Sequence, residues 1–170
     1  IIKILKKNGR AAVVLPDGSL FGEGVKTRIK EELLTTCNLH TIIRLPNGVF
    51  NPYTGIKTNL LFFEKGKATK ETWYYEMPYP EGIKNYSTTR PIDISHFEEI
   101  KEWWFNRTEN DYAWKVSYKE IKNRNFNLDI KKENTSEKQI LETTEELISI
   151  LETSFQRSAT ILNEIKKDLL

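Results

Sequence analysis

The chain has 170 residues, of which 38% are hydrophobic and 29% are charged. These values are typical of a globular protein with one ordinary core, and no apolar run approaches the ~20 residues that a membrane span needs. A single cysteine excludes an internal disulfide, and two histidines are too few to form a zinc site alone. No signal peptide is visible, so we expect a cytoplasmic protein. Because residue 1 is Ile and not Met, we expect the sequence to be part of a longer chain.

Charge is distributed unevenly along the chain, although the formal net charge is only +2. Residues 1–70 carry 12 Lys and Arg against 5 Asp and Glu, residues 71–130 carry 8 against 11, and residues 131–170 carry 6 against 8. A basic first segment fits phosphate contact by one part of the molecule. Ordinary surface lysines would produce a similar excess, so both interpretations remain.

The first 70 residues are predicted to alternate strands and helices. Residues 1–7 fit the last turns of a helix. Residues 10–15 are expected to form a strand, and their near-continuous apolar run is typical of a parallel sheet covered on both faces. A helix should follow at about residues 25–35, with strands at residues 39–45 and 59–64. The order of strand, helix and strand indicates a crossover unit of a doubly wound α/β sheet.

The composition changes after residue 70. Residues 71–77 are expected to form a strand, and residues 78–92, which are rich in Pro, Gly, Ser and Thr, an irregular segment. Helices are predicted at residues 96–106 and 117–124, the second of which starts with a capping-box pattern. Residues 125–129 should be extended. Three tryptophans of this region are interpreted as core residues rather than DNA-stacking groups: Trp103, Trp104 and Trp114.

Residues 135–170 show a heptad pattern without Gly or Pro. This pattern predicts one helix of about 50 Å, at ~1.5 Å per residue. A helix with one apolar stripe needs a partner surface, which could belong to its own domain or to another subunit. The stripe consists of apolar residues that recur every seven positions: Leu141, Ile148, Phe155, Leu162 and Leu169.

Two irregular loops next to apolar strands carry a family resemblance. Residues 46–58 form a turn-rich, aromatic-bearing loop before the strand at residues 59–63, and residues 16–24 form a loop after the strand at residues 11–15. Loops held by a rigid sheet are common sites of binding chemistry. At this separation, the segments resemble the later half of the catalytic domain of N6-adenine DNA methyltransferases. The resemblance is specifically to the modification subunit of type I restriction–modification systems and covers roughly residues 1–130.

The resemblance implies an α/β fold in three parts. Residues 1–70 would be the C-terminal part of a Rossmann-like methyltransferase sheet, residues 71–130 an aromatic-rich extension, and residues 131–170 a long C-terminal helical arm. It implies an enzyme that uses S-adenosylmethionine to methylate the N6 atom of adenine in DNA. The family's cofactor-binding and catalytic motifs are expected upstream, so this fragment alone should be inactive and bind neither cofactor nor metal.

The resemblance also implies partners. These are DNA, a specificity subunit, a second modification subunit and, in the full complex, a restriction subunit. The stripe of residues 135–170 would contact the specificity subunit or the neighbouring modification subunit, or pair with another copy of the fragment.

The alternative to a methyltransferase fragment is a non-catalytic interaction module that oligomerises through this helix, with loops that are purely structural.

Methylation of adenine N6 requires the base to be flipped out of the stack and held flat. By resemblance, Phe50 provides the aromatic platform, and Tyr53 is the second candidate; the alternative for Phe50 is a core position. Contacts to the DNA backbone are expected from Arg44, Lys57 and Thr58, although a solvated lysine is an equal alternative for Lys57.

Two further segments bear on the active site. An active-site loop is expected at the carboxyl edge of its strand, formed by Pro16, Asp17 and Gly18. Asp17 is not expected to act as a base, because methyl transfer requires no strong one. The segment Asn51–Tyr53 is interpreted as a turn and not as the family's catalytic motif, because it lacks a second proline and follows the strand–helix unit. The glycines of residues 22–24 do not have the spacing of a nucleotide fingerprint.

Overall fold

The computed structural model describes residues 1–132 and 155–158. The chain divides into two units, residues 1–132 and residues 133–170. In the second unit only residues 155–158 are described, and they are helical. The predicted long helix therefore lies almost entirely outside the described residues, together with Leu141, Ile148, Leu162 and Leu169 of its stripe. Phe155 of that stripe is described, and its side chain is 72% exposed.

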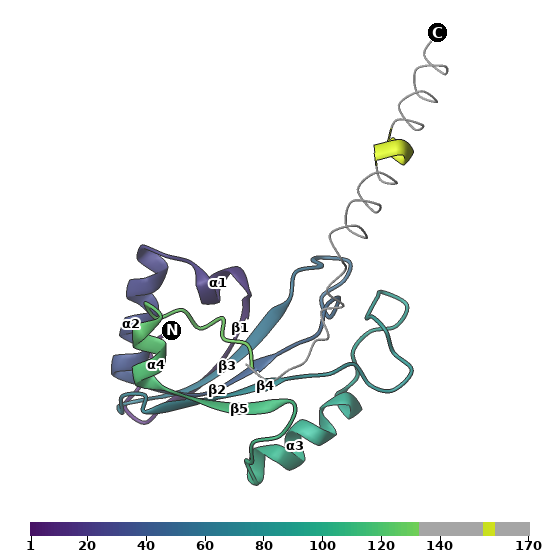
Figure 1. The fold of residues 1–170 in the computed structure, drawn as a ribbon. Coiled ribbons are helices and arrows are strands. Elements are labelled where there is room, and N and C mark those ends of the chain that lie inside the picture. Colours follow the sequence, from purple (N-terminus) through teal and green to yellow (C-terminus); the bar gives the residue numbers. More distant parts are fainter. Residues whose placement is uncertain (133–154, 159–170) are drawn as a thin grey trace. The chain divides into compact units, whose positions relative to one another are not determined.

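One five-stranded sheet organises residues 1–132 (Figure 1). Its strands are β1 (Arg10–Pro16), β2 (Cys37–Arg44), β3 (Thr58–Lys65), β4 (Glu71–Glu76) and β5 (Ala113–Ser117). Their order across the sheet is β1-β3-β2-β4-β5. β3 is antiparallel to both β1 and β2, β4 is parallel to β2, and β5 is antiparallel to β4.

The predicted crossover is present, with one difference in strand order. α2 (Val25–Thr36) connects β1 to β2, and these strands run in the same direction because both are antiparallel to β3. However, β3 is inserted between them, so the sheet is mixed. β1 lies at the edge of the described sheet, and its residues alternate between exposed and half-buried. The expectation that both faces of this strand are covered does not hold within the described residues.

Helices cover both faces of the sheet (Figure 1). α2 and α4 (Tyr118–Asn123) pack on one face, in a core with the completely buried Tyr74 of β4. The short 3₁₀ helix η1 (Ile94–Phe97) and α3 (Glu98–Phe105) pack on the other face. There Trp103 of α3 meets Tyr75, with ring centroids 5.0 Å apart. Neighbouring residues of β4 thus serve opposite cores, because successive side chains of a strand point to opposite faces. No described helix is long and apolar enough to cross a bilayer.

The composition change at residue 70 falls inside this sheet. β4 pairs with β2 along residues 41–44, and β5, which the sequence did not predict, completes the far edge. α4 begins at Tyr118, and the Oγ atom of Ser117 accepts a hydrogen bond from the Glu120 N–H (3.2 Å), as the capping pattern predicted. Trp103 and Trp114 are buried core residues, as expected, and Trp104 is half-buried against the second core.

Several local predictions were wrong. Residues 1–7 form turns rather than a helix. Val25 and Ile29 of α2 are exposed, at 71% and 54%, although they share helical spacing with the buried leucines. Lys30 is buried instead. Residues 125–126 form a turn with positive φ values rather than extended chain, which lets the chain reverse after α4.

Candidate functional site

The two loops identified in the sequence analysis, residues 16–24 and 46–58, meet at one end of the strands of the sheet. β1 ends at Pro16 and β3 begins at Thr58, and these residues are partners in the ladder. The Asp17 N–H donates to the Lys57 carbonyl (3.0 Å), and the Leu45 N–H donates to the Thr58 carbonyl (2.9 Å). Because β1 and β2 are parallel, their carboxyl ends lie at this same edge, which is where ligands bind in open α/β sheets.

The first loop is held by lysines of the helix that follows it. It contains a one-turn helix, α1 (Gly18–Phe21), rather than irregular chain throughout. The buried Lys30 donates from Nζ to the carbonyls of Leu20 (2.8 Å) and Gly22 (2.9 Å), and Lys26 reaches the first residue of α1. Burial lowers the pKa of the Lys30 ammonium group. The loop carbonyls are thus satisfied by this chain's own cations.

Beneath the loops lies a buried polar cluster. The fully buried Asn59 donates from Nδ2 to Asp17 Oδ1 (2.6 Å). The side chain of Arg44 is only 6% exposed and forms an ion pair with Asp129, with 2.8 Å between Nη1 and Oδ1. Its Nη2 atom lies 4.0 Å from Asp17 Oδ2, and its Nη1 donates to the Ile130 carbonyl (3.4 Å). This cluster joins both loops to the coil at residues 127–130.

Arg44 therefore occupies an internal position, whereas the sequence analysis placed it on the DNA backbone. The difference arises because Asp129, which is distant in sequence, lies beside the end of β2 and forms an ion pair with the Arg44 guanidinium group. Lys57 keeps an accessible ammonium group: its side chain is 41% exposed, and Nζ lies 3.8 Å from Glu76 Oε1. Thr58 is 7% exposed, and its Oγ1 has no hydrogen-bond partner among the described residues. Of these three positions, Lys57 is the one most open to a phosphate.

The second loop is fixed by the irregular segment at residues 78–92. Asn51 donates from Nδ2 to the Tyr86 carbonyl (3.1 Å), and Tyr79 donates from its hydroxyl to the Asn47 carbonyl (3.1 Å). Gly48 has a φ of +80°, and a Cβ atom there would lie 2.4 Å from the Tyr86 carbonyl oxygen. A side chain at this position would therefore push the loop away from its support. Asn51–Tyr53 forms turns, as predicted.

Tyr86 is itself anchored. Its ring is 1% exposed, and its hydroxyl lies 2.9 Å from Nδ1 of His96 in η1. The loop that carries the two candidate aromatics is thus tied, through Tyr86, to the helices on the second face of the sheet. The extension beyond residue 70 has a structural role in the candidate site.

The two candidate aromatic residues are exposed on this supported loop. Phe50 is 38% exposed and Tyr53 is 90% exposed, and the neighbouring Ile56 is 61% exposed. Phe50 is therefore not a core residue, and both rings can reach a ligand. The role of either ring in stacking on a base stays a prediction. Within residues 1–132 and 155–158, no group of three or more His, Cys, Asp or Glu side chains gathers as a metal site would require.

Sequence reasoning missed three residues that build the site. Asn59 carried a signal, because it is a polar residue at the start of an otherwise apolar strand. Tyr86 and Asp129 carried none, because their roles depend on contacts with residues more than 30 positions away.

Comparison with known proteins identifies the family. Residues 1–142 match the sequence profile described as N-6 DNA Methylase. The chain is 63% identical over 138 residues to the Escherichia coli type I restriction enzyme EcoEI methylase subunit; the match covers 77% of this chain and 28% of that protein. The chain thus spans about a quarter of the length of this relative.

Solved structures agree. A modification subunit of a putative type I restriction enzyme from Vibrio vulnificus matches with a TM-score of 0.64 and 55% identity, over 66% of this chain and 23% of that one. A chain from a study of complex assembly and conformational transition in the type I R-M system matches with a TM-score of 0.72 and 34% identity, over 96% of this chain and 36% of that one. The Rossmann-like α/β sheet predicted from the sequence is thereby confirmed. The chain belongs to the N-6 DNA methylase family.

Proposed function

We propose that this chain supplies the target-base side of the active site of a site-specific DNA adenine-N6 methyltransferase of a type I restriction–modification system. The proposal rests mainly on two exposed aromatic rings, those of Phe50 and Tyr53. They lie on a supported loop next to the carboxyl ends of β1 and β2. The membership of the chain in the N-6 DNA methylase family gives this edge its chemical context. Such a protein would act in the cytoplasm of a bacterium or archaeon, where its DNA lies.

The proposed role requires rigidity more than acid–base chemistry. A flipped adenine must be held flat so that its amino nitrogen meets the methyl donor. Phe50 provides the stacking surface, because its ring is exposed while the backbone beneath it is held by Tyr86 and Tyr79. Lys57 offers a nearby charge for a backbone phosphate. Asp17 has a positioning role, because its carboxylate is engaged by Asn59 and Arg44.

S-adenosylmethionine supplies the methyl group in such a reaction. In the turn at residues 22–24, a Cβ atom at Gly22 would lie 2.1 Å from Cδ of Lys26, whereas Gly24 has open space around it. Three carbonyls of the first loop, those of Gly18, Leu20 and Gly22, already accept hydrogen bonds from Lys26 and Lys30. We therefore propose that the cofactor is held by other parts of a longer protein and that this chain is inactive alone.

Alanine replacement of each aromatic ring tests the platform in the full-length methylase subunit that contains this sequence. Aromatic–base stacking is worth roughly 1–3 kcal/mol by alanine substitution, which is about a 5- to 150-fold change. Phe50→Ala should lower the rate of DNA methylation by that factor and leave the affinity for S-adenosylmethionine nearly unchanged. Methyl incorporation into a DNA duplex with one target site measures the first quantity, and calorimetric titration the second.

Phe105→Ala provides a matched control, because Phe105 is an equally large ring, 89% exposed, on helix α3 and not on the candidate loop. Its activity should equal that of the parent protein. A fully active Phe50→Ala with a crippled Tyr53→Ala would move the platform to Tyr53. Full activity of both variants would eliminate the loop as the base-binding element.

We also propose that the heptad stripe of residues 135–170 contacts the specificity subunit or a neighbouring modification subunit. A relative that covers 96% of this chain comes from a study of complex assembly in the type I R-M system, which supports an assembly role. The exposed Phe155 is consistent with a contact surface. Large-to-small changes at buried apolar positions cost about 2–5 kcal/mol each, so Ile148→Ala with Phe155→Ala should abolish pull-down by the specificity subunit.

Ile150→Ala, which lies off the stripe, should leave this pull-down intact. Sedimentation of the 170-residue chain tests the second possibility, that the stripe pairs two copies of the fragment. A monomeric chain together with undiminished pull-down by the double variant would show that the stripe is internal and has no partner.

A further inference from the structure

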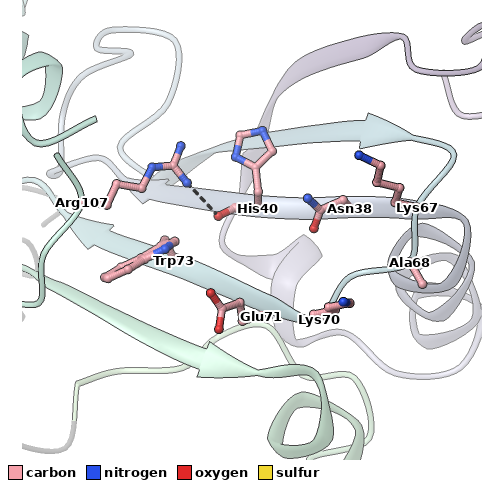
Figure 2. Close-up of a pocket in the computed structure, with 8 residues that line it drawn as sticks. All are labelled: Asn38, His40, Lys67, Ala68, Lys70, Glu71, Trp73 and Arg107. Carbon is pink, nitrogen blue, oxygen red and sulfur yellow. Dashed lines mark hydrogen bonds between the residues drawn. The ribbon is translucent and has the colours of Figure 1, made fainter. Parts of the chain in front are cut away.

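Figure 2 shows the residues that line a hollow of about 890 Å³. It is formed over the first half of β2, whose other end carries Arg44 and the loop with Phe50. Figure 2 shows Arg107 and Trp73 at one end of the hollow, Lys67 and Lys70 at the other, and His40 between them. The turn between β3 and β4 supplies the two lysines, and the segment after α3 supplies the arginine.

A β-bulge shapes this hollow. Leu39 pairs with Phe63 and Thr41 with Phe62, so His40 has no partner on β3. The carbonyl of His40 instead accepts a hydrogen bond from Nη1 of Arg107 (3.5 Å). Bulges re-aim side chains and are frequent beside functional sites. Here the bulge places the side chain of His40 and the hydrogen bond between Arg107 and the His40 carbonyl at the same hollow.

Arg107 is preorganised by aromatic rings. Its guanidinium carbon lies 4.5 Å from the ring centroid of Trp104 and 5.6 Å from that of Trp103. Burial lowers the pKa of the Arg107 guanidinium group. Contact with aromatic rings restricts the orientations of a guanidinium group, whose N–H fork suits bidentate binding of phosphate oxygens.

The charges around the hollow do not cancel. Its one acidic residue, Glu71, is paired with Lys115, at 3.3 Å between Oε2 and Nζ. No ion pair is formed by Lys67, Lys70 or Arg107 with any described residue. Three cations therefore surround the first hollow, and the one carboxylate among its lining residues is paired. A second hollow of about 510 Å³ shares His40 and Arg107 with the first, and its lining adds one further cation, Arg10, and one carboxylate, Glu64.

We propose that this hollow binds the phosphate groups of a nucleotide or of a nucleic-acid backbone. Three unpaired cations match a ligand with several negative charges, and the volume is that of a small-molecule site rather than of a single ion. The proposal is independent of the proposed methyltransferase role, because the hollow lies at the opposite end of β2 from the base-binding loop. It also needs no cofactor and no other part of a longer protein.

Binding measurements on the 170-residue chain test the proposal. The probes are a fluorescent 12-base-pair DNA duplex, ATP, inorganic tripolyphosphate and a poly-glutamate peptide, each titrated at several salt concentrations. Arg107→Gln and the double change Lys67→Gln with Lys70→Gln should each weaken phosphate binding roughly fivefold to tenfold, and each lost contact should lower the salt slope by about one. Arg107→Lys should retain part of the affinity. Binding of ATP and tripolyphosphate would identify a nucleotide site, and binding of the duplex alone a backbone site.

Lys119→Gln with Arg124→Gln is the matched control, because Lys119 lies on α4 and Arg124 directly follows it, at the other face of the sheet. It should bind like the parent chain. The two lysines of the hollow are exposed, so their variants will fold even if Arg107→Gln does not. The NMR signals of the His40 ring should shift with ligand, while those of His96 should not. The proposal is overturned if the control and the hollow variants weaken binding equally, if no phosphate probe binds, or if poly-glutamate binds the hollow more tightly than the phosphate probes.

Discussion

Breaking the ion pair between Arg44 and Asp129 should affect stability differently according to which partner is removed. The side chain of Arg44 is 6% exposed, whereas that of Asp129 is 30% exposed. Asp129→Ala leaves the guanidinium group of Arg44 buried, and the nearest remaining carboxylate is that of Asp17, with 4.0 Å between Nη2 and Oδ2. Arg44→Met keeps most of the aliphatic stem in place and leaves two carboxylates that water can still reach.

The expected magnitudes follow from these exposures. Removing one partner of a buried ion pair costs about 3–5 kcal/mol. Because Asp17 remains near the guanidinium, we expect Asp129→Ala to lie at the low end, about 3 kcal/mol. Hydration of the freed carboxylates should limit the cost of Arg44→Met to about 1–2 kcal/mol. The double variant should be more stable than Asp129→Ala alone, since it contains no uncompensated buried charge.

Urea unfolding followed by tryptophan fluorescence measures these differences in the 170-residue chain. All four tryptophans lie between residues 73 and 114, so the signal reports on the unit formed by residues 1–132. Lys101→Met is a suitable control, because its ion pair with Glu98 is exposed and should contribute less than about 1 kcal/mol. Equal destabilisation by Arg44→Met and Asp129→Ala, or additive effects in the double variant, would show that the buried charge does not control stability here.

Three further predictions follow from the same structure. Gly48→Ala should lower DNA methylation by the full-length subunit without changing cofactor affinity, because its Cβ would meet the Tyr86 carbonyl; Gly55→Ala, with open space around it, should be active in the same assay. Burial, and then the charge of Arg107, lower the pKa of His40 below its ordinary value of 6.5, so the native state resists its protonation. The free energy of unfolding should therefore fall as the pH drops below about 6.5 and level off below the native pKa of His40. Urea unfolding at pH ~8 and ~5.5 measures this loss of stability, and His40→Gln should remove the part that is due to His40. Calorimetry should detect negligible S-adenosylmethionine binding by the 170-residue chain, and tight binding would contradict the proposal that the cofactor site lies outside it.

The sequence by itself determined the elements and the place of the loops. Apolar runs and helical spacing located β1 to β4, α2, α3 and α4 to within a few residues, because these patterns record which face of each element is buried. Turn residues and aromatic residues marked residues 46–58 as the candidate binding loop. These features are local, so a single sequence was enough to find them.

Only the tertiary structure decided how the elements combine. The insertion of β3 between β1 and β2 depends on hydrogen bonds between backbone groups. Because every residue type has these groups, the sequence does not show which strands pair. Arg44 reads as a surface cation at the end of a strand, and it becomes internal only because Asp129 returns beside it. Likewise, His40 and Arg107 are 67 positions apart, and a bulge brings them together. Local patterns locate the helices and strands, whereas contacts between residues that are far apart in the sequence determine which side chains interact. The chemistry of both sites depends on these interactions.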